Sequence, residues 1–77
     1  MLKVWGGSLD GMRRTIVCAP TKKRAVELLR SNGPILSMHY FNDYWSETGN
    51  CEELAVATTE GVWTADDMWG AAFVKVR

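Results

Sequence analysis

The chain has 77 residues, a formal net charge of zero at pH 7 and two cysteines. We expect residues 1–77 to form one small domain, because this length leaves no room for a second. No apolar run approaches the roughly 18 residues that a membrane span requires. Gly6 and Asp10 interrupt the N-terminal stretch, so no signal peptide is predicted and a cytoplasmic protein is the simplest expectation.

The first elements are predicted to be two strands. Residues 2–5 alternate between apolar and polar side chains, and residues 14–19 are rich in β-branched side chains, which is typical of strands paired as a hairpin. Residues 6–11 between them have the composition of a turn. The Gly6-Gly7 pair is not predicted to bind phosphate, because no complete phosphate-binding motif follows and the loop leads to a strand.

The third element is predicted to be a helix that begins after Thr21, its N-cap, and ends at residues 32–34, Asn-Gly-Pro. Its expected buried face consists of Ala25, Leu28 and Leu29, with Val26 at the margin. Three cations, Lys22, Lys23 and Arg24, occupy the first turn, where each opposes the helix dipole at a cost of about 0.3–1 kcal/mol. They are either a phosphate-binding or acid-binding cluster or simply solvated side chains.

An aromatic helix is predicted next. Met38, Phe41 and Trp45 have the spacing of one helical stripe, and we expect Phe41 and Trp45 to face the core. Tyr40 and Tyr44 form a second pair beside this stripe. Tyrosine has an apolar body and a polar tip, so a core position and a contact surface both stay open for this pair.

Capping signals delimit this helix and the next one. Ser37 is the predicted N-cap of the aromatic helix, and Gly49 is expected to close it in a left-handed conformation. Asn50 is predicted to cap a third helix over residues 51–58, with Glu53 completing a capping box. The two helices would then meet at a tight corner at residues 47–50. Leu54, Ala55 and Thr58 are expected to lie on one side of this third helix.

The C-terminal part is predicted to contain two further strands, at residues 62–65 and 73–77, with Val74 and Val76 on one face. A loop over residues 66–70 separates them. The order is therefore two strands, three helices and two strands. This order predicts an α+β domain in which an antiparallel sheet of about four strands carries helices on one face.

The sequence does not indicate an enzyme, a metal site or a cofactor. Cys18 and Cys51 are too few for a recognisable zinc pattern and are expected to be free, buried thiols, although a disulfide between them stays open. A nucleophilic pair would have to join one of them to His39, the only histidine, and no residue that would orient it can be named.

The charges are unevenly distributed. Residues 1–30 have a net charge of +5, residues 31–70 have a net charge of −7 and contain no lysine or arginine, and residues 71–77 have a net charge of +2. Such asymmetry can indicate surfaces with different partners. Alternatively, the basic and acidic parts fold against each other and neutralise one another.

Two kinds of partner follow from these patterns, and a homo-oligomer stays open because of the four tryptophans. An acidic and aromatic surface would suit a basic region of another protein, and its expected contacts are Tyr40, Tyr44, Glu47, Asp66, Asp67 and Trp69. The alternative is a helix-turn-helix-like DNA-binding regulator in residues 21–44, whose phosphate contacts would be Lys22, Lys23 and Arg24. Asp43 and the neutral net charge oppose this alternative.

Three segments resemble small, uncharacterised proteins of phages and prophages: Val-Trp-Gly-Gly at 4–7, Arg-Thr-Ile-Val at 14–17 and Tyr-Phe-Asn-Asp-Tyr-Trp-Ser-Glu-Thr-Gly-Asn at 40–50. The resemblance covers residues 3–63, and residues 44–50 are its most specific part. It implies a phage accessory protein in a host cytoplasm and brings no established activity with it. Small phage proteins often bind and disable a host protein, so the resemblance suggests an inhibitor of a host defence or transcription system.

Overall fold

The computed structural model describes residues 1–8, 14–30, 37–65 and 73–76. An antiparallel sheet has the strand order β3-β1-β2-β4-β5. The strands are β1 (Lys3–Gly7), β2 (Thr15–Ala19), β3 (Ser46–Glu47), β4 (Gly61–Thr64) and β5 (Val74–Lys75). The helices are α1 (Lys22–Arg30), α2 (Met38–Tyr44) and α3 (Cys51–Val56). The predicted contacts Asp66, Asp67 and Trp69 lie outside the described residues.

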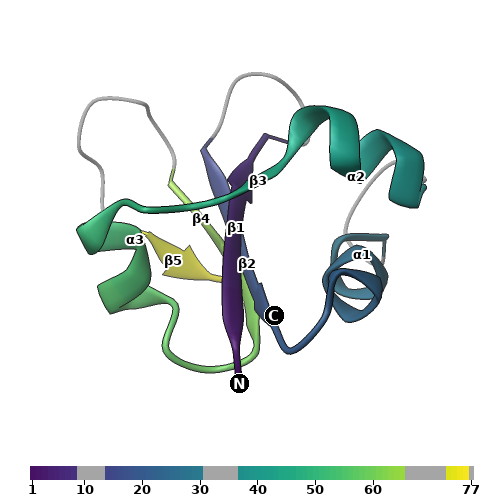
Figure 1. Ribbon diagram of the computed structural model, residues 1–77. Helices are drawn as coiled ribbons and strands as arrows, with labels where there is room; N and C mark the ends of the chain where they lie inside the picture. Colours follow the sequence, from purple (N-terminus) through teal and green to yellow (C-terminus); the bar gives the residue numbers. More distant parts are fainter. Residues whose placement is uncertain (9–13, 31–36, 66–72, 77) are drawn as a thin grey trace.

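The α+β class is confirmed, but the prediction that all helices lie on one face of the sheet is wrong. Helices α1 and α2 cover one face, and α3 lies against the other (Figure 1). The central strand β2 is buried at every position, which is the pattern of a strand with both faces covered. The sheet also has a strand more than expected, because Ser46 and Glu47 pair with β1.

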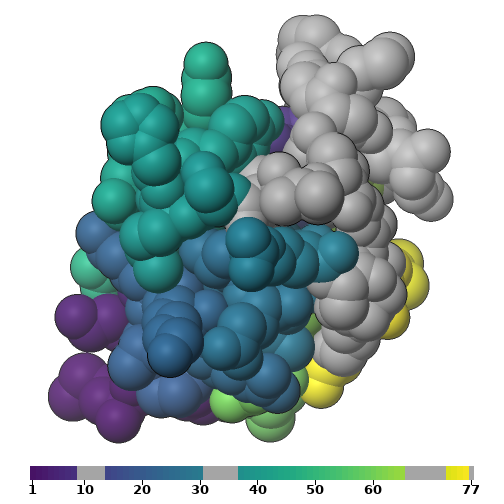
Figure 2. Space-filling model, turned by 90° about the vertical axis from the view of Figure 1, so that its right-hand side faces the viewer, coloured from purple at the N-terminus to yellow at the C-terminus, as the bar shows by residue number. Residues whose placement is uncertain are grey.

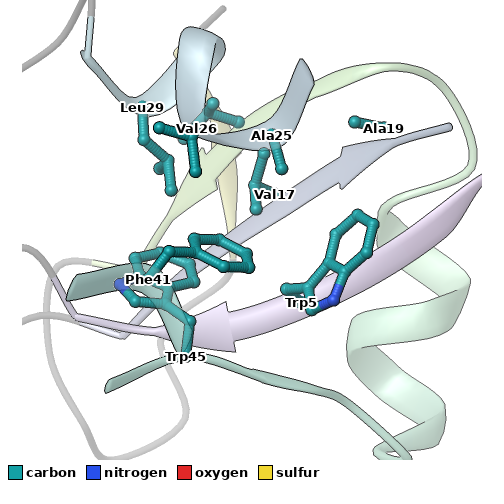
Figure 3. Packing of buried hydrophobic residues seen from close by; sticks show 9 residues of the cluster. Trp5, Val17, Ala19, Ala25, Val26, Leu29, Phe41 and Trp45 are labelled. Atoms are coloured by element: carbon teal, nitrogen blue, oxygen red, sulfur yellow. The ribbon is translucent and has the colours of Figure 1, made fainter. Parts of the chain in front are cut away.

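The larger core lies between the sheet and helices α1 and α2 (Figure 3). Phe41 is fully buried, and its ring meets Trp5 edge-on at 5.9 Å and stacks on Trp45 at 5.7 Å between centroids. The predicted core positions of Phe41 and Trp45 are thus confirmed. On α1 the buried residues are Ala25, Val26 and Leu29, whereas Leu28 is only half-buried, so the buried face is rotated from the predicted one.

The Gly6-Gly7 pair belongs to strand β1 and not to the predicted turn. A Cβ atom on Gly7 would lie 2.6 Å from Cδ2 of Trp45, and a Cβ atom on Gly6 would collide with the guanidinium of Arg14. Because neighbouring strand positions point to opposite faces, one glycine makes room for Trp45 and the other for Arg14. The missing side chains, and not backbone flexibility, explain this pair.

Helix α2 does not run into a corner at Gly49. It ends at Tyr44, and Trp45 is already extended, with φ −121° and ψ 143°. The chain then forms β3, and Gly49 does not have a positive φ. The three predicted N-caps are confirmed. The hydroxyls of Thr21 and Ser37 each accept a hydrogen bond from a first-turn N–H, and the Asn50 side chain accepts two.

Helix α3 is shorter than predicted, and its exposed side carries most of its apolar residues. It ends at Val56, and Leu54, Ala55 and Thr58 are all exposed. Glu53 is the buried helical residue instead, at 5% exposure, because its carboxylate reaches across to Arg14. Cys18 is free and buried as expected, but Cys51 is free and exposed, which corrects its predicted burial.

Candidate functional site

A stacked pair of tyrosines lies on the outer part of α2. Tyr40 and Tyr44 are one helical turn apart, and their rings are tilted by 37° with centroids 4.6 Å apart. Tyr40 is half-buried against the core that contains Phe41, whereas Tyr44 is 66% exposed. Tyr40 therefore supports the ring of Tyr44, which presents a large aromatic surface to solvent.

Carboxylates border this pair. Asp43 lies in the last turn of α2, at the negative end of the helix dipole. This turn contains no basic residue. Its Oδ2 is 3.4 Å from Nε2 of the highly exposed His39. Glu47 is exposed on β3 and pairs in register with Trp5, whose side chain lies in the core under α2, so Glu47 lies on the same side of the sheet as the helix.

We call the group formed by Tyr40, Asp43, Tyr44 and Glu47 the tyrosine surface. Figure 2 shows the face of the molecule on which α2 (teal) lies above α1 (blue). Of the predicted contacts, the structure places Tyr40, Tyr44 and Glu47 on this side of the sheet. Sequence reasoning missed Asp43 as a contact, although its position three residues after Tyr40 places it beside that tyrosine on a helix.

The basic cluster at the start of α1 is partly neutralised within the chain. Arg24 Nε is 2.7 Å from Oε1 of Glu60, and Arg24 also contacts Glu27 at 3.4 Å. The hydrogen bond to Glu60, together with the charges of both carboxylates, raises the pKa of Arg24. Lys22 Nζ lies 3.4 Å from the side-chain oxygen of Asn42, and Lys23 is exposed. The three cations are therefore not equally available to a phosphate.

A second polar cluster fixes α3 to the sheet on the opposite face. Arg14 Nε donates to Glu53 Oε1 at 2.7 Å, and the Thr48 hydroxyl donates to Glu53 Oε2 at 2.6 Å. Burial on its own would raise the pKa of Glu53, but the hydrogen bonds from Arg14 and Thr48 and the charge of Arg14 together lower it. This cluster has the features of a structural clamp, because its carboxylate is already satisfied.

The clamp predicts a specific loss of stability in acid. A carboxylate whose pKa is lower in the folded chain contributes stability above its unfolded pKa, and this contribution disappears as the pH falls through the folded pKa. We expect the urea midpoint to fall from about pH 5 downward, more steeply than in a Glu53→Gln variant, which has no proton to gain. Equal pH slopes for the two proteins would show that Glu53 does not carry this dependence.

The residues that a nucleophilic pair would need are separated. His39 lies on α2 and Cys51 begins α3, and these helices cover opposite faces of the sheet. Burial raises the pKa of the Cys18 thiol, so the reactive thiolate form is less populated there. Within the described ranges, no group of three or more His, Cys, Asp or Glu side chains is arranged to hold a metal ion.

Comparisons with known proteins do not indicate a function for this chain. The chain matches no family model, no curated protein sequence and no solved structure. None of the three described helices is long and apolar enough to cross a membrane. The tyrosine surface is the described feature that combines an exposed large aromatic ring with neighbouring carboxylates.

Proposed function

We propose that this chain is a small phage-type accessory protein that acts by stoichiometric binding to a host protein through the tyrosine surface, and that it inhibits a host defence or transcription system. The observation that carries the proposal is the 66% exposure of Tyr44 on a ring pair bordered by carboxylates. Tyrosine is enriched among the residues that dominate binding energy in protein interfaces. The phage-type assignment is supported by the resemblance of the segment 40–50.

The support beneath the tyrosine pair makes it suitable for recognition. Phe41 lies between the two tyrosines in the sequence, and its ring is fully buried. Trp45 is also buried and anchors the C-terminal end of α2. The N-terminal end of α2 is capped by Ser37. A surface held in place in this way loses little conformational freedom when a partner binds, and that lowers the entropic cost of association.

A quantitative affinity purification from a bacterial host lysate tests the proposal. The tagged wild-type chain should enrich one host protein in a stoichiometric ratio, and Tyr44→Ala should reduce its recovery at least about tenfold, the effect of losing roughly 1.4 kcal/mol. Leu54→Ala is the matched control, since Leu54 is also exposed and apolar but lies on α3, across the sheet. Equal recovery with wild type and Tyr44→Ala would refute the role of the tyrosine surface.

The DNA-binding alternative is tested by a salt titration. Lys22 and Lys23 are exposed near the N-terminal end of α1, but Arg24 is paired with Glu60, and α2 carries no lysine or arginine. We therefore expect weak binding to generic duplex DNA. Tight binding that weakens steeply with added salt, and that Lys22→Ala and Lys23→Ala reduce, would reject protein binding as the function and support a DNA-binding regulator.

A further inference from the structure

The side chains around α2 divide into two flanks. With about 100° between successive residues, Tyr40, Asp43 and Tyr44 form one continuous group, and Asn42 lies on the far side of the helix from the tyrosine pair. Lys22 contacts Asn42 and therefore lies on that other flank. Lys22 is thus kept away from the tyrosine pair.

The charged groups that α2 and β3 contribute beside the pair are two carboxylates, Asp43 and Glu47, and one histidine, His39. Residues 31–70 contain no lysine or arginine, so neither α2 nor β3 contributes a cation other than a protonated His39. Asp43 and the C-terminal end of the helix dipole lie together, and Glu47 follows on the same side of the sheet. Within the described part of the chain Glu47 forms no ion pair, and the only ion-pair partner of Asp43 is the exposed His39.

We propose that the occupant of the tyrosine surface is an arginine-bearing segment of the partner protein, with a guanidinium group stacked on the Tyr44 ring and hydrogen-bonded to Asp43. This inference rests on the proposed function and adds the chemistry of the partner. A planar guanidinium can stack on an aromatic face and can donate two parallel hydrogen bonds to a carboxylate, whereas an ammonium group offers only a point charge. Tyr44 is 66% exposed, and the exposed Asp43 precedes it on the same helix, so both kinds of interaction are offered within one helical turn.

A peptide titration monitored by amide NMR tests this chemistry directly. The probe is a blocked Gly-Arg-Gly-Arg-Gly peptide, and the comparison peptide replaces both arginines by lysines. We expect the arginine peptide to shift the amide signals of residues 40–47 and to bind about threefold or more tighter than the lysine peptide, the size of an exposed cation–π contact. Equal affinities, or shifts confined to other residues, would overturn the assignment to a guanidinium.

Three variants separate the stacking contact from the charge contact. Tyr44→Phe keeps the aromatic ring and should retain the preference for arginine, whereas Tyr44→Leu and Asp43→Asn should each reduce arginine-peptide binding by about threefold or more. Leu54→Ala should leave it unchanged, as a control for folding and for nonspecific effects. Unchanged arginine-peptide binding in Tyr44→Leu would overturn the inference.

The outcome also distinguishes this inference from the proposed function. If a host protein depends on Tyr44 for capture while the arginine peptide does not bind, the guanidinium inference fails and the protein-binding function stands. If residues 40–47 respond to added unlabelled wild-type chain and not to the peptide, the occupant is a second copy of this chain, and the inference is again overturned. Arginine-peptide binding that depends on both Tyr44 and Asp43 supports it.

Discussion

Phe41→Ala should lower the free energy of unfolding by about 3–5 kcal/mol, the cost of removing a fully buried aromatic side chain. Phe41 has no exposed surface and contacts the rings of both Trp5 and Trp45, so its removal leaves a cavity at the centre of the larger core. A domain of this size has little stability in reserve. We therefore expect much of the variant to be unfolded in buffer, with a loss of tryptophan near-ultraviolet circular dichroism.

Tyr44→Ala on the same helix is the matched control for this prediction. Its ring is 66% exposed and contacts only one other described ring, that of Tyr40. We expect the free energy of unfolding, measured by urea titration, to change by no more than about 1 kcal/mol, as for other surface aromatic pairs. If Phe41→Ala were as mild as Tyr44→Ala, α2 would not be packed on the sheet as described.

Gly7→Ala should destabilise the fold by about 1–3 kcal/mol, the usual cost of overpacking a close-packed site. The new Cβ atom would lie 2.6–2.9 Å from three atoms of the Trp45 indole, which is too close for carbon atoms in contact. Trp45 is also restrained by its stacking on the buried Phe41 ring. The expected signs are a lower urea midpoint and a change in tryptophan fluorescence.

The control for Gly7 is Gly49. A Cβ atom at Gly49 would have no neighbour within 4 Å, and this glycine does not have a positive φ. Gly49→Ala should therefore leave stability unchanged or raise it by about 0.4–1 kcal/mol through the lower entropy of the unfolded chain. A large loss of stability in Gly49→Ala would instead support the left-handed conformation of Gly49 that was predicted from the sequence.

Local chemistry in the sequence predicted the local features of the fold. Ser37 and Asn50 are N-caps as expected, because the hydrogen bond from a cap depends only on residues within the next turn. The burial of Phe41 and Trp45 followed from their helical spacing, although Trp45 lies one residue beyond the helix. Tyr40 and Tyr44 lie beside this stripe, and their degree of exposure was left open.

The errors come from contacts between residues distant in the sequence. Gly6-Gly7 has the composition of a turn, and only the approach of Arg14 and Trp45 from opposite faces explains its place in a strand. The burial of Glu53 was not predicted, because it depends on the pairing of its carboxylate with Arg14, 39 residues away. The apolar run of β2 was the available sign that the sheet is covered on both faces.

The charge asymmetry has a mixed explanation. Two long-range ion pairs, Arg14 with Glu53 and Arg24 with Glu60, join the basic and acidic parts of the chain. The basic part thus neutralises some of the acidic part. Within the described ranges this neutralisation does not extend to Glu47, and His39 is the only ion-pair partner of Asp43. Among the described carboxylates of residues 31–70, Glu47 beside the exposed tyrosine and Glu52 on α3 have no ion-pair partner.

Site-specific photocrosslinking tests the role of the tyrosine surface most directly. A photoreactive phenylalanine analogue would replace Tyr44 in one protein and Leu54 in another, and both would be irradiated in host cells. We predict one discrete crosslinked product of a host protein from position 44, suppressed when excess wild-type chain is co-expressed, and none from position 54. A product from position 54 alone, or identical products from both positions, would contradict the account.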